Sequence, residues 1–481
     1  MNPAHRPDAG LRRVPPAEAS APRLPHDPAL PQLAHALDAD RMASVFAAAL
    51  GAVPLRTCRV DRVKYRPGRN CSVSYVLTLH DAQRGGDVEQ RVAARFCSGG
   101  TSAERHLDAR RHAQVASAAG PALMHDPALD MLAHWWPNDP KLEAVALLHD
   151  DAHLRTHCIE KAAAALTGAT GCLLGHRTSI AQYVPEVRVC ARVDVTLRRS
   201  GTAPASHATL FAKAATQHAG SAVHAAMQAL WQSPAQAAGR FATPQPLLWQ
   251  AAAGLHWQRG VAGRPLHEVD PATGSASSAR VAERLAALHA TPVAGLPRVT
   301  SSALARRVEG VAALLGQVEP SWQGLLGPLA ARIAAGASRW GDAPPATLHG
   351  DLHPANIVDG GATLTFIDLD SMCAGPAVVE LGAWVGDAMV RAVHAGTSQA
   401  QATPAWRAFL GAYAAASGRP VDERALAWSV AHHLLCTRAY RGVANLKAGR
   451  FEAVPAVLAL AARVAEAGSV DAALEWKQEA A

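Results

Sequence analysis

Two stretches in the first half of the chain alternate apolar and polar residues in the pattern of β-strands. They are KYRPGRNCSVSYVLTL at 64–79 and QYVPEVRVCARVDVTL at 182–197. Successive side chains of a strand point to opposite faces, so an apolar residue at every second position predicts a strand with one buried face. Both stretches begin with Tyr-x-Pro and end with Thr-Leu. We therefore expect each of them to form two strands joined by a turn.

The same two stretches belong to an internal repeat. Thirty residues separate Tyr65 from Arg95, and thirty also separate Tyr183 from Lys213, so Arg95 aligns with Lys213 without a gap. After a short insertion, a further resemblance follows between ALDMLAHWWPND (128–139) and AAGLHWQRGVAG (252–263). A repeat at a fixed offset indicates one structural unit used twice. Each copy is predicted to form three strands, a helix and then two more strands.

The pattern changes to helices after residue 275. Apolar residues then recur at helical spacing in the segments 279–290, 302–316, 378–393 and 423–446. We therefore expect an α+β fold, with a β-rich half before a helical half and a hinge at 259–269. The predicted divisions are a disordered tail at 1–40, an α+β cap domain at 41–150, a helical linker at 151–175, a β-rich lobe at 176–262 and a helical lobe at 263–470.

Composition excludes several classes of protein. The net charge is +7, but the arginines are scattered, without a basic cluster interleaved with aromatics, so we expect no nucleic-acid partner. No apolar run reaches membrane-spanning length, and the N-terminal residues contain no hydrophobic signal core. The eight cysteines include no Cys-x-x-Cys pair, which is typical of reduced thiols. These features together predict a cytoplasmic protein without a membrane partner.

The segment LHGDLHPANIVDGGATLTFIDLD, residues 348–370, concentrates four carboxylates and an Asn around short apolar runs. Unpaired carboxylates are costly to desolvate, so a cation is expected beside them. The turn Asp-Gly-Gly predicts a hairpin that brings Asp351, Asn356 and Asp368 to one end. An amide oxygen and a carboxylate suit Mg²⁺, and a second carboxylate kept off the metal can deprotonate a hydroxyl. This division of labour is typical of phosphoryl transfer.

The run H-G-D-L-H-P-A-N, followed by I-D-L-D and G-P, resembles the motif shared by aminoglycoside phosphotransferases, choline kinases and related small-molecule kinases. The resemblance is specific over residues 345–385 and weaker from 178 to 450. It implies a bilobal protein-kinase-like fold that uses ATP and Mg²⁺. By this match Asp351 is the catalytic base, Asn356 and Asp368 bind Mg²⁺, and His349 braces the loop.

The same resemblance assigns the nucleotide contacts. Lys213, at the end of the third strand of the second repeat, corresponds to the lysine that holds the α- and β-phosphates. The segment 246–263, with Gln258 and Arg259, resembles the strand and hinge that receive adenine through backbone groups. Asp370 either contacts the metal or caps the following turn.

The chain also differs from protein kinases and from the usual family pattern. Protein kinases have Arg before the catalytic Asp, where this chain has Gly350, and six residues between Asp368 and Gly375 leave no room for an activation segment. The family pairs its strand lysine with a helix Glu, but no acid follows Lys213 until Glu268. Two alternatives are open. Another side chain replaces the Glu, with Gln217, His224, Gln228 and Glu104 as candidates, or Lys213 only ends its strand. Glu380 stands where the family more often has Asp and is expected to brace the site.

The acceptor is expected to lie between the catalytic loop and the C-terminal helices. Residues 381–450 contain three acids against eight Lys or Arg residues, which disfavours a polycationic antibiotic. Five aromatics there could stack on a sugar or belong to the core: Trp384, Trp406, Tyr413, Trp428 and Tyr440. The extra N-terminal domain resembles the cap of maltokinases. We therefore expect a small-molecule kinase acting on a sugar or sugar-like alcohol. The alternatives are an antibiotic phosphotransferase and a pseudokinase that binds nucleotide without turnover.

Overall fold

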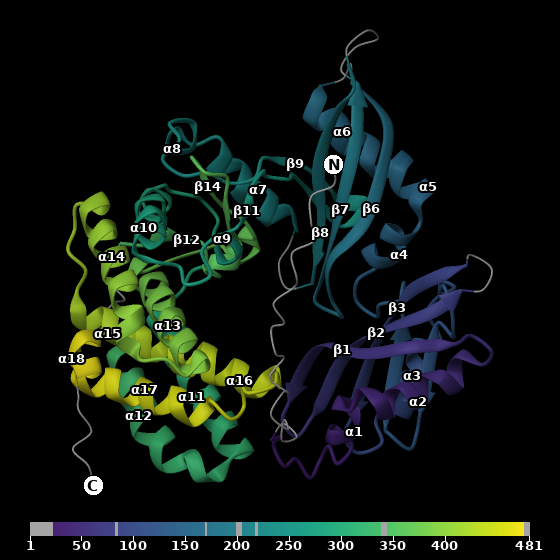
Figure 1. Cartoon of the computed structure of the whole chain (residues 1–481), viewed down its shortest axis with the longest axis horizontal. Helices are drawn as coiled ribbons and strands as arrows, with labels where there is room; N and C mark the ends of the chain where they lie inside the picture. The colour runs from purple at the N-terminus through teal and green to yellow at the C-terminus, as the bar shows by residue number, and fades with distance from the viewer. Residues whose placement is uncertain are drawn as a thin grey trace, which may run out of the picture.

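The computed structural model describes residues 23–81, 85–168, 171–198, 204–216, 220–337 and 344–475. In Figure 1 two β-sheets lie on one side of the molecule, and the helical half lies on the other. Within the described ranges, no helix is both long and apolar enough to cross a membrane. The expected order of a β-rich half before a helical half, in an α+β fold, is confirmed.

The first sheet has five strands in the order β1-β2-β3-β5-β4. Its elements are α1 (Leu33–Leu37), α2 (Ala39–Leu50), β1 (Leu55–Arg66), β2 (Asn70–Asp81), β3 (Gly86–Cys97), α3 (Ser102–Ala109), β4 (Leu123–Asp126) and β5 (Met131–Trp135). Helix α2 begins after Asp38, whose carboxylate caps the N–H groups of Asp40 and Arg41. The predicted tail at 1–40 extended too far: residues 1–22 lie outside the described part, but Leu30 and Leu33 are already buried in the core.

The second sheet repeats this topology, with the order β6-β7-β8-β10-β9. Its elements are α4 (Ala144–His149), α5 (Asp151–Leu154), a π-type turn (Arg155–Ile159), α6 (Glu160–Thr167), β6 (Cys172–Val184), β7 (Arg188–Arg198), β8 (Ser206–Ala215), α7 (Gly220–Trp231), α8 (Pro234–Ala237), β9 (Pro246–Gln250) and β10 (Leu255–Arg259). In both copies a helix separates the third strand from the last two. The extra N-terminal domain therefore resembles the second β-rich lobe, as the repeat predicted.

The repeat extends to the register and to single hydrogen bonds. Arg95 lies opposite Ser72 across β2 and β3, and Lys213 lies opposite Cys190, the repeat counterpart of Ser72, across β7 and β8. Tyr65 donates its hydroxyl to Asp27 over 2.8 Å, just as Tyr183 donates to Asp139 over 2.7 Å. Each of these carboxylates also accepts the N–H of a left-handed residue in the next turn. Those turn residues are Gly68 and Glu186.

The helical half contains the predicted helices and a few short strands. Its elements are β11 (Arg264–Pro265), α9 (Leu266–Val269), α10 (Ser275–His289), α11 (Ser301–Val318), α12 (Gln323–Ala337), β12 (Ala346–Leu348), β13 (Ile357–Asp359), β14 (Leu364–Phe366), β15 (Cys373–Gly375), α13 (Ala377–Ala395), α14 (Gln399–Ser417), α15 (Glu423–His433), α16 (Tyr440–Ala444), α17 (Val454–Ala467) and α18 (Val470–Glu475). A π-type turn at Leu434–Ala439 divides the helix expected at 423–446. Strand β1 of the first sheet contacts α16, so the N-terminal domain reaches the helical half as well (Figure 1).

Four of the five aromatics considered for sugar stacking belong to the core of the helical half. Trp384 stacks on Phe409 with ring centroids 5.1 Å apart, and the Trp428 indole donates to the carbonyl of Ile333. Trp406 and Tyr413 are also buried. The core interpretation of these side chains is therefore the right one.

Candidate active site

The loop after β12 turns sharply at Gly350. Its φ angle is 84°, in the left-handed region that side chains disfavour. A Cβ atom at this position would lie 2.0 Å from the carbonyl oxygen of Ser371. Glycine is therefore required here, and the arginine found at this position in protein kinases would not fit this backbone.

The carboxylate of Glu380, on α13, anchors the backbone of this loop. It accepts the N–H of His349 over 2.9 Å and the N–H of Gly350 over 2.8 Å. His289 contacts the same carboxylate over 2.9 Å. Burial alone raises the pKa of Glu380, but the contacts with His289 and His349 outweigh it and lower that pKa. An ionised, fully bonded Glu380 therefore fixes the backbone of the loop.

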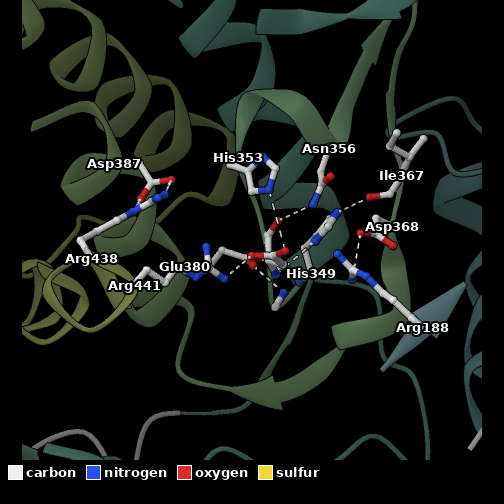
Figure 2. Close-up of polar contacts among 12 residues, drawn as sticks. Arg188, His349, His353, Asn356, Ile367, Asp368, Glu380, Asp387, Arg438 and Arg441 are labelled. Atoms are coloured by element: carbon white, nitrogen blue, oxygen red, sulfur yellow. Dashed lines mark hydrogen bonds and ion pairs between the residues drawn. The ribbon is translucent and has the colours of Figure 1, made fainter. Parts of the chain in front are cut away.

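The ring of His349 joins the loop to the end of β14. It is fully buried, and its Nε2 donates to the carbonyl of Ile367 over 2.9 Å (Figure 2). With the proton on Nε2, its Nδ1 is the acceptor facing the N–H of Asp351 at 3.4 Å. Both ring nitrogens are engaged with the backbone, which supports a bracing role rather than a chemical one.

The hairpin brings the three motif residues together. Asn356 donates its side-chain amide to the carbonyl of Asp351 over 2.9 Å, and the N–H of Ile367 donates to the carbonyl of Asn356 over 2.9 Å. Asp368 follows with a φ of 61°. A non-glycine residue in this region is strained, and such strain concentrates at functional sites. Figure 2 shows Asn356 and Asp368 on the same side of the loop.

Lys213 of the second sheet reaches this hairpin. Its Nζ donates to Asp368 over 2.6 Å and to Asp370 over 2.9 Å. Burial lowers the pKa of Lys213, but the carboxylates of Asp370 and Asp368 outweigh it, so the pKa is raised. In the same way Lys213 lowers the pKa of Asp368 against the opposing effect of burial. Lys213 and Asp368 therefore form a partly buried, charged pair between the two halves of the chain.

This pair replaces the helix partner that was considered for Lys213. His224 of α7 instead lies 3.2 Å from His256, measured between their Nδ1 atoms. Within the described residues, neither Gln228 nor Glu104 forms a hydrogen bond or ion pair with Lys213, and Gln217 lies outside them. Asp368 and Asp370 therefore balance the charge of Lys213, the role expected of a helix Glu from the family resemblance.

Several residues beside the site were not predicted from the sequence. Arg188, at the start of β7, lies 3.6 Å from Asp368. Arg441 of α16 lies 3.5 Å from the carboxylate of Asp351, which is 29% exposed. His353 lies 3.8 Å from the same carboxylate. Arg188 and Arg441 come from segments far from the motif in sequence, so no local spacing predicts their contacts, whereas His353 belongs to the motif itself.

A buried carboxylate near the catalytic loop contacts a histidine and an arginine. Asp387 of α13 contacts His433 and Arg438. Burial raises the pKa of Asp387, but His433 and then Arg438 lower it by more, so the carboxylate is ionised. Figure 2 shows Asp387 and Arg438 beside the catalytic loop, on the side away from Asp368.

The two residues assigned to adenine lie on β10. Gln258 is buried, and Arg259 is exposed. The N–H of Arg259 donates to the carbonyl of Gln245 over 2.9 Å, and the N–H of Gly260 donates to the carbonyl of Thr209 over 2.7 Å. These two donors are therefore already used within the protein, and an adenine contact here would involve other backbone groups.

The oxygen atoms around Asp368 fit magnesium better than a softer metal. They comprise two carboxylates, Asp368 and Asp370, and the Asn356 side-chain oxygen, which accepts no hydrogen bond from the described residues. The described residues contain no cluster of three or more His, Cys, Asp or Glu able to hold a metal alone. Mg²⁺ commonly takes one or two carboxylates and completes its shell with water and phosphate. The donor set therefore fits a magnesium ion brought with a nucleotide.

Comparison with known proteins agrees with this geometry. A model of the phosphotransferase enzyme family matches residues 197–428, from the end of β7 into α15. No curated protein matches the chain.

Among solved structures, a choline/ethanolamine kinase family protein from Mesorhizobium loti has a TM-score of 0.42 at 17% identity, over 68% of this chain and 98% of its own. Ethanolamine kinase from Plasmodium vivax has a TM-score of 0.40 at 10% identity, over 60% and 82%. The aminoglycoside phosphotransferase APH(3'')-Id from Streptomyces rimosus has a TM-score of 0.36 at 19% identity, over 52% and 89%. These likenesses are too distant to bear on the substrate of this chain.

The matched segment contains Lys213, the loop at 349–351 and the hairpin that ends at Asp368. Residues 197–428 thus match the model of the phosphotransferase enzyme family, and the match indicates that the chain is a phosphotransferase.

Proposed function

We propose that the chain is an ATP- and Mg²⁺-dependent kinase that transfers the γ-phosphoryl group to a hydroxyl of a small metabolite, a sugar or sugar-like alcohol. The observation that carries the proposal is the contact of Lys213 with Asp368 and Asp370 beside Asp351 and Asn356. A cation for phosphate, an oxygen set for magnesium and a partly exposed carboxylate lie together. Positioning and charge neutralisation supply most of the catalysis in phosphoryl transfer.

Each of these residues has a role in the proposed reaction. Lys213 binds the phosphates, while Asn356 and Asp368, with Asp370 beside them, are the residues that hold Mg²⁺. Bound magnesium supplies neutralisation of phosphate charge. Asp351 orients the acceptor hydroxyl and accepts its proton. The acceptor oxygen forms a bond to the γ-phosphorus, the bond to the β-γ bridging oxygen breaks, and ADP leaves. The segment around Gln258 and Arg259 receives adenine.

The charge around Asp351 supports a neutral or anionic acceptor. A cavity of about 190 Å³ is bordered by Arg441, which also contacts Asp351. The charged and titratable side chains that line this cavity are all basic: His394, Arg438, Arg441, Lys447 and Arg450. An aminoglycoside, or a cationic alcohol such as choline, would meet like charge there. A sugar would not.

The test is ADP release by the purified chain with ATP and Mg²⁺, against pools of sugars, amino alcohols and aminoglycosides. We expect turnover with a sugar pool. Asp351→Asn should lower it on the order of 10²–10⁴-fold, because the general base is lost. Asp87→Asn is the matched control, since Asp87 is an exposed carboxylate of the first sheet. Turnover confined to an aminoglycoside pool would contradict the proposed acceptor. ATP binding without turnover on any pool would favour the pseudokinase alternative.

A further inference from the structure

The face of the first sheet that carries Arg95 is polar. Strand alternation places Tyr75 and Trp135 on the opposite face, where both rings contact Phe46 of α2 with centroids 5.0 and 5.8 Å away. That opposite face is the core of the N-terminal domain. The Arg95 face carries Ser72 and Ser74 of β2 instead, because they occupy the alternate positions of the same strand.

A cavity of about 260 Å³ lies over this polar face. In Figure 1 the first sheet lies directly below the second, and the turn between β6 and β7 points towards it. Helix α3 and this turn, through Pro185 and Glu186, line the cavity opposite the sheet. The lining includes five Lys or Arg side chains against only two carboxylates, those of Asp108 and Glu186. With its histidines neutral, the cavity therefore has an excess of three positive charges.

Glu186 balances only part of this charge. It pairs with Arg95 and, over 3.0 Å, with Lys141. Burial raises the pKa of Glu186, but Arg95 and then Lys141 lower it by more, so it is ionised. Among the described residues, Arg62, Lys64 and Arg105 form no ion pair, although all three line the cavity. Three cationic side chains are left without an anion.

Two buried polar atoms on the same face also lack partners. Ser74 is 2% exposed, and its Oγ forms no hydrogen bond with any described residue. The Nε of Arg95 is likewise buried and unbonded. Buried polar groups are nearly always hydrogen-bonded, so each exception needs an explanation. Here both belong to residues that line one positively charged cavity.

We propose that this cavity is a second binding site of the chain, for a small molecule that carries a phosphate group. Phosphate is doubly charged and accepts several hydrogen bonds, so it matches the unpaired cations and the free donors together. Ligand pockets usually measure about 300–1,000 Å³, and this cavity of about 260 Å³ is just below that range, so it suits a small ligand such as a sugar phosphate or free phosphate. The site lies on the repeat counterpart of the Lys213 face.

Calorimetric titration of the full-length chain tests the proposal, with glucose 6-phosphate in one arm and inorganic phosphate in the other. The variant is Lys64→Met, which removes a cavity cation without breaking an ion pair of the described residues. Arg69→Met is the matched control: it makes the same charge change from the exposed β1–β2 turn, outside the cavity lining. Thermal unfolding establishes that each variant is folded. Ser74→Ala carries the test if Lys64→Met does not fold.

We expect Lys64→Met to weaken binding of at least one probe about tenfold or more, because a charged hydrogen bond is lost. Ser74→Ala should weaken it about threefold or more, and Arg69→Met should leave it unchanged. Tight binding of glucose 6-phosphate alone would identify a phosphorylated metabolite, and equal binding of both probes would identify phosphate itself. The proposal is overturned if neither probe binds, or if Lys64→Met and Ser74→Ala both bind as tightly as the unchanged chain.

Discussion

The two five-stranded sheets share one topology and one strand register, but their equivalent cations face different surroundings. Lys213 of the second sheet contacts Asp368 and Asp370, which follow it by 155 and 157 residues in the chain. Arg95 of the first sheet contacts Glu186, in a turn of the other sheet. A repeated unit therefore fixes where a cation stands on the sheet. The segment that folds against that face decides what the cation can do.

The largest expected difference between the sheets is in catalysis. Lys213→Met should lower kcat/KM for ATP on the order of 10²–10³-fold, because it removes a preorganised charge that faces the phosphates. Arg95→Met makes the equivalent change in the first sheet, and its fall in kcat/KM should be at least ten times smaller. Steady-state kinetics at saturating acceptor measures both. Equal losses would mean that the first sheet also takes part in turnover.

The second prediction concerns the loop after β12, which leads into the hairpin that Lys213 contacts. Gly350→Ala should destabilise the chain by about 1–3 kcal/mol, because Ala is strained at this positive φ, and its Cβ would also meet the Ser371 carbonyl. Gly361→Ala is the control, since Gly361 has a similar φ of 85° but open space around its Cβ position. Urea unfolding measures both variants. If they lose the same stability, the close contact at Gly350 contributes nothing.

The third prediction concerns the partner of Arg95. Glu186→Gln should lower the free energy of unfolding by about 1–3 kcal/mol, because charged hydrogen bonds to Arg95 and Lys141 are lost in a mostly buried position. Glu89→Gln is the control, since the Glu89 carboxylate on the first sheet is 58% exposed and its ion pairs should contribute little. A change at Glu186 no larger than at Glu89 would show that the pair does not stabilise the contact between the sheets.

The smallest expected effect is a pH dependence of stability. It comes from the residue opposite Lys213, which differs from the residue opposite Arg95. Lys213 lies opposite His256 on β10, whereas Arg95 lies opposite Leu132 on β5. Burial, reinforced by His224 and Lys213, lowers the pKa of His256 to about 3. The unfolded chain binds this proton below about pH 6.5 and the folded chain does not, so stability falls as the pH falls from about 6.5 towards 3.

His256→Gln should remove this slope. Between pH 6.5 and 5.5 the unchanged chain should lose about 1 kcal/mol more unfolding free energy than the variant. Urea unfolding at several pH values measures the difference, with His267→Gln as an exposed control. Parallel curves for His256→Gln and the unchanged chain would show that His256 does not carry the pH dependence.

Much of this arrangement could be predicted because it depends on local spacing. Alternation along 182–197 reports which side chains share a strand face, and a tight turn forces Asn356 and Asp368 to the same end of a hairpin. The offset shared by Arg95 and Lys213 predicted their equivalent positions for the same reason. The tail limit was wrong because Leu30 and Leu33 are buried only through contacts with a domain that lies later in the chain.

The sequence by itself determined the duplicated sheets, the helical half and the cluster of Asp351, Asn356 and Asp368, because neighbours in the chain specify strands, helices and turns. Only the tertiary structure decided that Lys213 pairs with the hairpin, that Arg441 and Arg188 border the site, and that Glu186 lies over the first sheet. These are contacts between charges far apart in sequence. Their partners are selected by which surfaces meet and by the cost of leaving a buried charge unpaired, and no local pattern records either of these.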